Sequence, residues 1–141
     1  MKRFPVIGVL CISAVFGLSA CSDDSSPSEE ATEAAADLCT DLGALKADNA
    51  KLKALNPATA TKDQIKEAYD AVQDDWADVK ENVSKLREAE RAAVQTAAED
   101  LKKGYEDLPG DTTGNDALTQ LQPQIQKLDE TSTAAVADLQ C

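Results

Sequence analysis

A long run of apolar residues, spaced alternately four and three positions apart, constrains the fold of this chain more than any other feature. The run follows a capping-box pattern, Thr61 to Gln64, and no glycine or proline interrupts residues 62–103. Such spacing places the apolar side chains on one face of an α-helix, as in a coiled coil. We therefore predict one helix of about 45 residues, roughly 65–70 Å long. Its apolar positions are Ile65, Tyr69, Val72, Trp76, Val79, Val83 and Leu86 and, after a four-residue stutter at Glu90, Val94, Ala97, Leu101, Tyr105 and Leu108.

Two shorter helices are predicted on either side of the long one. The first covers about residues 30–55 and ends at Asn56-Pro57, and the second runs from about residue 115 to the C-terminus. Asn49 occupies an apolar position of the first helix. We interpret it as an exposed or weakly packed residue. The alternative is a polar group that sets the register of a helix seam. Pro123 is expected to kink or restart the second helix. Their apolar stripes are Leu38, Leu42, Leu45, Leu52 and Leu55, then Leu118, Leu121, Ile125, Leu128, Ala135 or Val136, and Leu139, with the polar Ser132 at one position of the second stripe.

The predicted fold class is all-α. We expect an elongated, antiparallel, coiled-coil-like bundle of three helices, in which the long central helix is a spine for the two shorter ones. The alternative breaks the central helix near residues 87–91 and forms an up-down four-helix bundle. Residues 86–91 are strong helix formers, which favours the continuous helix. Thin two-helix packing buries little surface, which favours the bundle. The continuous helix is the preferred prediction.

The start of the chain indicates export and lipid attachment. Lys2 and Arg3 precede an uncharged, mostly apolar stretch over residues 4–20, which is the layout of a signal peptide. Leu18-Ser19-Ala20-Cys21 resembles the lipobox of bacterial lipoproteins, so Cys21 is the predicted lipidation site. The resemblance implies a diacylglyceryl thioether, with palmitate-type acyl chains, at a new N-terminus. The alternatives are an uncleaved membrane helix and an ordinary cysteine after an ordinary cleavage site.

Three segments follow from this interpretation. They are a signal peptide over residues 1–20, the lipidated cysteine with a disordered tether over residues 21–31, and a helical domain over residues 32–141. Cleavage removes Lys2 and Arg3 and leaves 12 basic against 26 acidic residues, a net charge of −14. So acidic a chain would be repelled by nucleic acid and by anionic lipid surfaces. We expect the lipid anchor to hold it at the extracytoplasmic face of the cell membrane.

Two cysteines remain once the start of the chain is set aside. Cys11 lies in the signal peptide and Cys21 carries lipid, which leaves Cys39 and Cys141. In an exported protein these are predicted to form a disulfide, although two unpaired buried thiols are the alternative. A bond across so long a loop stabilises by about 4–5 kcal/mol in the chain-entropy model. Both predicted folds place the two cysteines at a similar height along the helices, so the disulfide is compatible with either fold.

A row of six carboxylates lines the face of the long helix opposite its apolar stripe, with Asp75 beside it. It is interpreted as a solvated outer face, with a docking strip for a cationic partner, or a weak divalent-cation site, as the alternative. A dedicated calcium site needs about six to eight converging oxygens, which a straight helix face does not supply, so no metal site is predicted. The row consists of Asp63, Glu67, Asp70, Asp74, Asp78 and Glu81.

The sequence contains no candidate for catalysis. It has no histidine, no glycine-rich phosphate loop and no activated nucleophile, so we expect neither an enzyme nor a cofactor. Tyr69, Trp76 and Tyr105 are interpreted as core residues.

In its lipobox, composition and two outlying cysteines, the chain resembles the small, alanine-rich, acidic helical lipoproteins of high-GC Gram-positive bacteria, the actinobacterial type. That resemblance implies attachment to the outer face of the cytoplasmic membrane. The expected function is a non-catalytic interaction protein of the cell envelope, with a protein partner still to be identified. The alternative is a carrier of a small apolar ligand between the helices.

Overall fold

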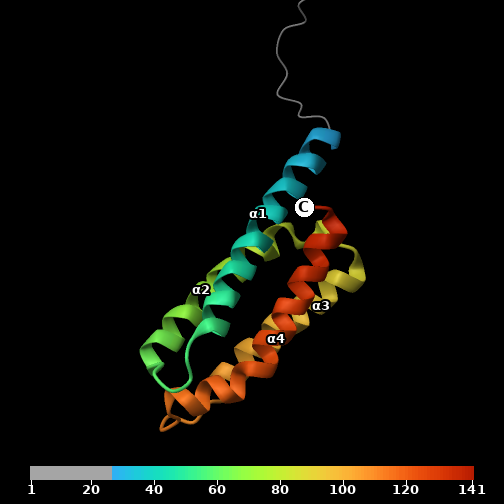
Figure 1. Ribbon diagram of the computed structural model, residues 1–141. Helices are drawn as coiled ribbons and strands as arrows, with labels where there is room; N and C mark the ends of the chain where they lie inside the picture. Colours follow the sequence, from blue (N-terminus) through green and yellow to red (C-terminus); the bar gives the residue numbers. More distant parts are fainter. Residues whose placement is uncertain (1–26) are drawn as a thin grey trace, which may run out of the picture.

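The structure, a computed structural model, describes residues 27–141. Four α-helices, α1 (Pro27–Ala54), α2 (Lys62–Asn82), α3 (Glu88–Glu106) and α4 (Gly114–Leu139), pack antiparallel into one elongated bundle (Figure 1). A single 3₁₀ turn, η1 (Val83–Lys85), follows α2. The described part of the chain has no strand, which confirms the predicted all-α bundle. The predicted signal peptide, the predicted lipidation site Cys21 and residues 22–26 lie outside the described residues.

The helix ends follow local sequence signals. Thr61 and Gln64 form the predicted capping box at the start of α2: the Gln64 amide donates to the Thr61 hydroxyl at 3.2 Å, and the Thr61 amide donates to the Gln64 side-chain oxygen at 3.0 Å. α1 begins at Pro27, so residues 27–31, assigned to the tether from the sequence, are helical. Proline suits the first helical position because no backbone donor is needed there. α4 runs without a break through Pro123.

The predicted central helix is not continuous, and the four-helix alternative describes the fold. After η1, Leu86 and Arg87 are extended, with ψ of 149° and 151°, and α3 then runs back beside α4. The helix propensities of residues 86–91 exceed those of ordinary residues by only a few tenths of a kcal/mol per residue. Burying one Leu or Val contributes about 1.5–3 kcal/mol. Folding back places the apolar side chains of α2 and α3 in one shared core, so burial outweighs local propensity.

The core is organised around α1 and α4. α1 packs along both α2 and α4, and α3 packs along α4, whereas α2 and α3 meet mainly at their junction. Tyr69 of α2 also stacks on Tyr105 of α3, with ring centroids 3.9 Å apart. Nearly all predicted apolar positions are buried, including Trp76; Leu55, Val83, Tyr105, Leu108 and Leu139 are only partly covered.

Asn49 is the one polar position that the sequence interpretation placed incorrectly. The interpretation as an exposed or weakly packed residue is wrong, since Asn49 is 1% exposed and its side-chain amide donates to the Ile125 carbonyl on α4 at 2.9 Å. The other side-chain atom, Oδ1, is buried without a partner among the described residues. Asn49 therefore links α1 to α4 at one register, as the second interpretation proposed.

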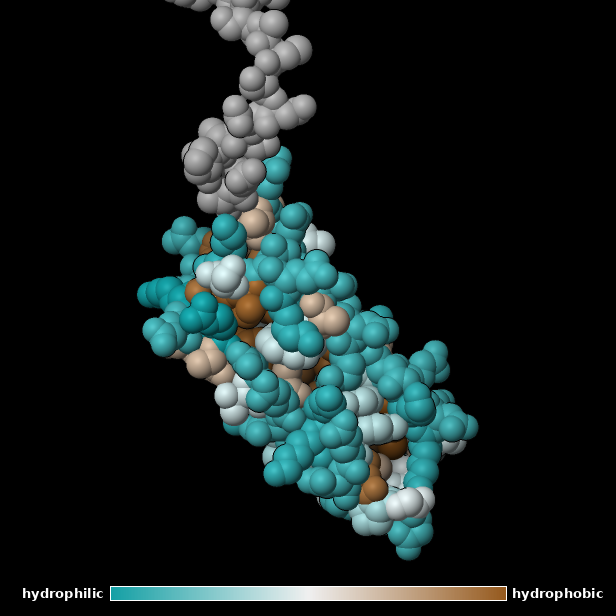
Figure 2. Space-filling view, turned by 180° about the vertical axis from the view of Figure 1, so that it is seen from behind, coloured by the Kyte–Doolittle hydropathy of each residue, from teal (hydrophilic) through white to brown (hydrophobic). Residues whose placement is uncertain are grey.

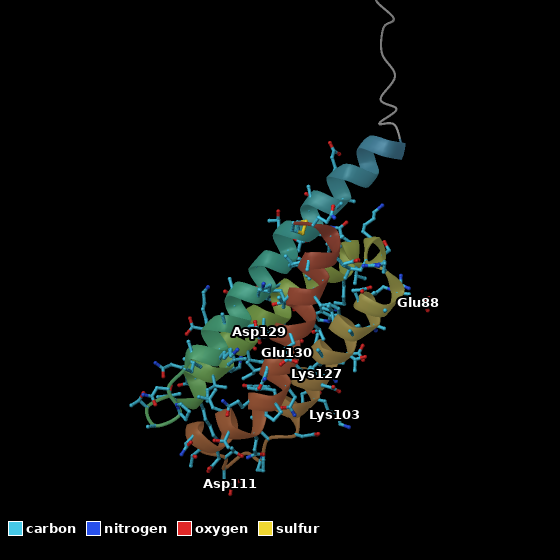
Figure 3. The ribbon with its side chains drawn as sticks, turned by 45° about the vertical axis from the view of Figure 1, so that its right-hand side comes forward. Glu88, Lys103, Asp111, Lys127, Asp129 and Glu130 are labelled. Atoms are coloured by element: carbon cyan, nitrogen blue, oxygen red, sulfur yellow. A yellow bond between two sulfur atoms is a disulfide. The ribbon has the colours of Figure 1, made fainter. Side chains whose placement is uncertain are left out.

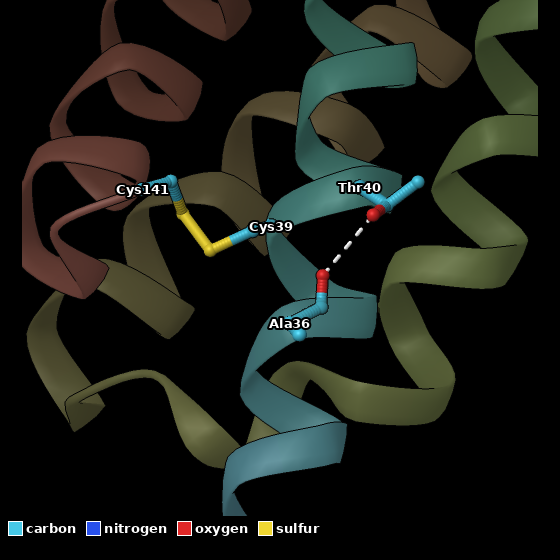
Figure 4. Close-up of a disulfide and its surroundings, with 4 residues drawn as sticks. All are labelled: Ala36, Cys39, Thr40 and Cys141. Carbon is cyan, nitrogen blue, oxygen red and sulfur yellow. Dashed lines mark hydrogen bonds between the residues drawn. A yellow bond between two sulfur atoms is a disulfide. The ribbon is translucent and has the colours of Figure 1, made fainter.

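The predicted disulfide is present in the structure. Cys39 on α1 and Cys141, two residues beyond α4, are joined with their Cα atoms 5.7 Å apart (Figure 4). The bond closes the end of the bundle at which α1 enters and the chain ends (Figure 1). It therefore ties the first helix to the last.

The opposite end of the bundle is closed by contact between its two loops. A Cβ atom added to Gly114, the first residue of α4, would lie 2.0 Å from the Ala60 carbonyl oxygen of the α1–α2 loop. Real Cβ atoms essentially never approach so closely, so the loops can meet only if residue 114 is glycine. Gly43, in the middle of α1, has no atom within 4 Å of its added Cβ.

These two glycines give a matched pair of substitutions. We expect Gly114→Ala to destabilise the bundle by about 1–3 kcal/mol, because overpacking must separate the loops. Gly43→Ala should stabilise by about 1 kcal/mol, through helix propensity alone. Chemical denaturation of the two variants measures both effects. Equal free energies of unfolding for the two variants would contradict the loop contact.

Candidate functional site

All six carboxylates of the predicted acidic row lie on α2, along its solvent-facing side. Five are exposed and Asp70 is half-buried. Lys66, one turn before Asp70, forms an ion pair with it. Among the described residues, the other five members of the row have no ion-pair partner. The structure therefore places every member as predicted and leaves most of the negative charge unneutralised.

Charges on the rest of the bundle are arranged differently. Lys127 of α4 pairs with Asp100 of α3 at 2.6 Å, and Lys53 of α1 pairs with Asp129 of α4 at 2.9 Å. Figure 3 shows Lys127, Asp129 and Glu130 following one another along α4. Here acidic and basic groups bridge neighbouring helices. Among the described residues, the α2 row has no such bridge to another helix, so most of its negative charge is not neutralised.

Asp75 does not belong to the row. Its side chain is half-buried, and Oδ2 is buried without a hydrogen-bond partner in the described chain. Burial raises the pKa of Asp75, and the nearby carboxylates of Asp48 and Asp78 raise it further. Lys51, which pairs with Asp48, partly offsets this effect. The folded chain therefore favours the protonated, neutral form of Asp75 more than the unfolded chain does.

The described residues include no cluster of three or more histidine, cysteine or carboxylate side chains placed to hold a metal ion. The geometry of the row explains this for α2, because successive carboxylates are separated along the helix axis and do not converge on one point. Binding by the row can therefore rest only on its summed negative charge.

A second feature is a pocket at one end of the bundle. Hydrophobic side chains emerge between hydrophilic ridges on the face formed by α2 and α3, which lie behind α1 and α4 in Figure 1 (Figure 2). Where the α3–α4 loop meets the start of α2, a half-open cavity of about 220 Å³ lies at the end of the bundle far from the disulfide. It is lined by Lys62, Ile65, Tyr105, Leu108, Pro109, Gly110, Thr112 and Ala117.

The pocket has an apolar wall and a polar rim. Tyr105 is held by its stack on Tyr69, and burial, together with Glu106 and Tyr105, raises the pKa of Tyr69 to about 12. Both tyrosines therefore belong to the packing. Lys62 spans the rim and donates to the Gly110 carbonyl at 2.5 Å. The sequence interpretation missed this site, because the Pro109–Gly110 turn is recognisable only as a turn and not as a neighbour of Lys62.

Comparison of the chain with protein-family models, with curated proteins and with solved structures finds no significant match. In residues 27–141, no helix combines the length and apolar character that crossing a membrane requires.

The buried carboxylate gives a pH-dependent prediction. Because the folded-state pKa of Asp75 lies above its ordinary value of 3.8, the folded state keeps the proton longer, and stability falls as pH rises from that value through the raised pKa. We expect Asp75→Asn to raise the melting temperature at neutral pH and to lose this advantage near pH 3, where Asp75 is protonated in both states.

Asp74→Asn is the control, because it removes the same charge from an exposed neighbour. Melting curves of the two variants across the acidic range measure the difference. The same gain from both substitutions at neutral pH would show that Asp75 carries no penalty of its own.

Proposed function

We propose that this protein is a non-catalytic interaction protein of the cell envelope, held by a lipid at the extracytoplasmic membrane face, that binds a basic partner through the acidic row of α2. The observation that carries the proposal is the row itself: six carboxylates on one exposed helix face, with one ion pair among them in the described chain. On α3 and α4, Asp100 and Asp129 instead pair with lysines of neighbouring helices.

Electrostatics supports binding of a cationic surface. Like charges three or four positions apart on a helix repel by about 0.2–0.5 kcal/mol per pair. A partner that presents lysine or arginine at matching spacing relieves this repulsion and adds its own attraction. Such attraction acts mainly on the rate of association and falls with salt, because the Debye length is about 10 Å at 0.1 M. The expected partner is therefore a protein with a basic strip, bound reversibly.

The lipid anchor rests on the lipobox resemblance at Leu18 to Cys21. Only five residues separate Cys21 from Pro27, where α1 begins. A linker this short keeps the bundle close to the membrane to which Cys21 would be attached. The mature net charge of −14 argues against direct adsorption to an anionic lipid surface, so the acyl chains are the attachment.

The row is tested by charge removal with a matched control. We expect Asp70→Asn, Asp74→Asn and Asp78→Asn, combined, to reduce capture of a synthetic lysine-rich peptide and of envelope proteins by about tenfold at low salt. Neutralising Glu88, Glu99 and Glu130 to glutamine removes the same charge from α3 and α4. Pull-downs at two salt concentrations compare the two variants. An equal loss for both would show that net charge alone acts, and would remove the row as a docking surface.

The anchor is tested at Cys21. We expect Cys21→Ser to leave the precursor uncut or to release the chain from the membrane, because the thioether that carries the diacylglyceryl group needs the thiol. Membrane fractionation and the size of the chain on a gel measure both outcomes. A membrane-bound band of mature size from this variant would contradict lipidation.

A second candidate function is supported by the pocket between α2, α3 and the following loop. Its volume of about 220 Å³ suits a small apolar molecule, and Lys62 and Thr112 at its edge would bind one polar group of that molecule. Organic extraction of the purified chain, followed by mass spectrometry, tests this carrier role. A Tyr105→Ala variant that retains the same extracted molecule at the same yield would rule out the pocket as its site.

A further inference from the structure

The junction between α2 and α3 breaks at two residues that favour helix, Leu86 and Arg87, which follow the weaker helix formers Asn82, Val83 and Ser84. Val83–Lys85 form a single 3₁₀ turn, and only Leu86 and Arg87 leave the helical region. No glycine or proline lies between residues 62 and 103. The extended conformation of two residues therefore depends on tertiary contacts and not on the local sequence. A short connection of this kind straightens into continuous helix when those contacts are satisfied in another way.

The contacts across the bundle divide it into two hairpins. One is α1 with α2 and the other is α3 with α4, and each pair packs along its length. The hairpins meet mainly through α1 and α4, where Asn49 donates to the Ile125 carbonyl and Lys53 pairs with Asp129. α2 and α3 share little beyond their junction and the Tyr69–Tyr105 stack. All of these contacts form equally well when the two hairpins belong to different chains.

A straightened junction would keep its apolar side chains in register. Val79, Val83 and Leu86 follow the four-and-three spacing, and Val94 resumes the stripe after a four-residue stutter at Glu90. In one continuous helix these positions lie on a single face. The stripe that α2 buries against α1 and the stripe that α3 buries against α4 would then face the same side, each available to its usual partner helix.

We propose that the junction at residues 83–87 is a hinge through which two copies of this chain exchange their α3–α4 hairpins. In the exchanged dimer, residues 62–106 form one helix in each copy, and each lobe combines α1 and α2 of one copy with α3 and α4 of the other. This exchange of hairpins requires no partner at the acidic row of α2. Its chemical partner is a second copy of the same chain.

The position of the hinge makes the exchange compatible with anchoring in one membrane. The junction, Cys141 and the start of α1 all lie at the same end of the bundle (Figure 1). Opening the hinge therefore places two lobes on either side of a common centre, and both copies of α1 begin near that centre. Both tethers would reach the same membrane surface. Confinement of anchored chains to a surface also raises their effective concentration, which favours exchange.

The disulfide decides which form is trapped. Cys39 belongs to the first hairpin and Cys141 follows the second, so the bond within one chain prevents its hairpins from separating. Exchange must precede oxidation. In the dimer, Cys39 of each copy faces Cys141 of the other, and each pair of thiols gives up two protons and two electrons to a disulfide oxidant, as it does in the monomer. The same bond thus locks either the monomer or the exchanged dimer.

The test uses two full-length chains in detergent, both with Cys11→Ser and Cys21→Ser. The first also carries Cys141→Ser and the second carries Cys39→Ser, so neither can close its own disulfide. The two are unfolded, mixed and refolded with oxidised and reduced glutathione. Mass spectrometry of non-reduced peptides then counts the cross-linked pairs. We expect Cys39–Cys141 bonds between chains to exceed Cys39–Cys39 and Cys141–Cys141 bonds at least tenfold.

A hinge variant separates exchange from chance collision. Glu88, labelled in Figure 3, is the first residue of α3 and follows the extended Arg87, so Glu88→Pro fits the closed turn. The same proline would break a continuous helix. We expect Glu88→Pro in both chains to reduce the Cys39–Cys141 cross-link at least tenfold, whereas Glu88→Ala leaves or increases it.

Two further outcomes keep the test decisive. Glu88→Pro with Cys39 and Cys141 both intact must give an oxidised monomer with an unchanged or higher melting temperature, which shows that the variant folds. If mixed pairs are no more frequent than like pairs, or if Glu88→Pro leaves their yield unchanged, the hinge does not open and the proposal is wrong.

Discussion

The fold depends on burying one apolar stripe from every helix in a single core. α2 and α3 each present a narrow stripe, and neither packs along the other. Each is covered because α1 and α4 lie side by side and offer a surface on either flank. Val72, Val94 and Leu101, from helices on opposite sides, are all fully buried. A continuous central helix would leave each half covered by a single short helix. The turn at residues 83–87 follows from that difference in buried area, at a small cost in helix propensity.

Periodicity and caps could be predicted from the sequence because they are local. The stripes, the Thr61–Gln64 box and the exposed position of the α2 row depend on spacing along one helix, and the structure places them as expected. The disulfide could be predicted by a different route, since the predicted export signal and the count of cysteines left one pair. The break at Leu86 and Arg87 could not be predicted, because no residue there disfavours helix and the competing term is the burial of distant side chains.

Side-chain contacts between helices also could not be predicted from the sequence. Asn49 has the same local pattern whether it is exposed or bonded to the Ile125 carbonyl, and only the approach of α4 distinguishes the two. The pocket has the same origin. Ile65, Tyr105 and Thr112 become neighbours only when the α3–α4 loop closes over the start of α2. Gly114 is required for that closure, because the Ala60 carbonyl occupies the place of a Cβ.

Local and global preferences therefore agree along most of this chain and conflict at one place. A sequence in which every level is consistent specifies a single structure, and a conflict leaves a second arrangement close in free energy. Here the conflict concerns two extended residues, and the second arrangement preserves every contact between hairpins by using another copy. The monomer is favoured because two separate chains keep more translational and rotational entropy than one dimer. The exchanged dimer is favoured because the hinge residues become part of a continuous helix in each copy. The proposed lipid anchor would concentrate chains on one surface and so reduce the first advantage, and the Cys39–Cys141 disulfide would fix whichever arrangement formed before it closed.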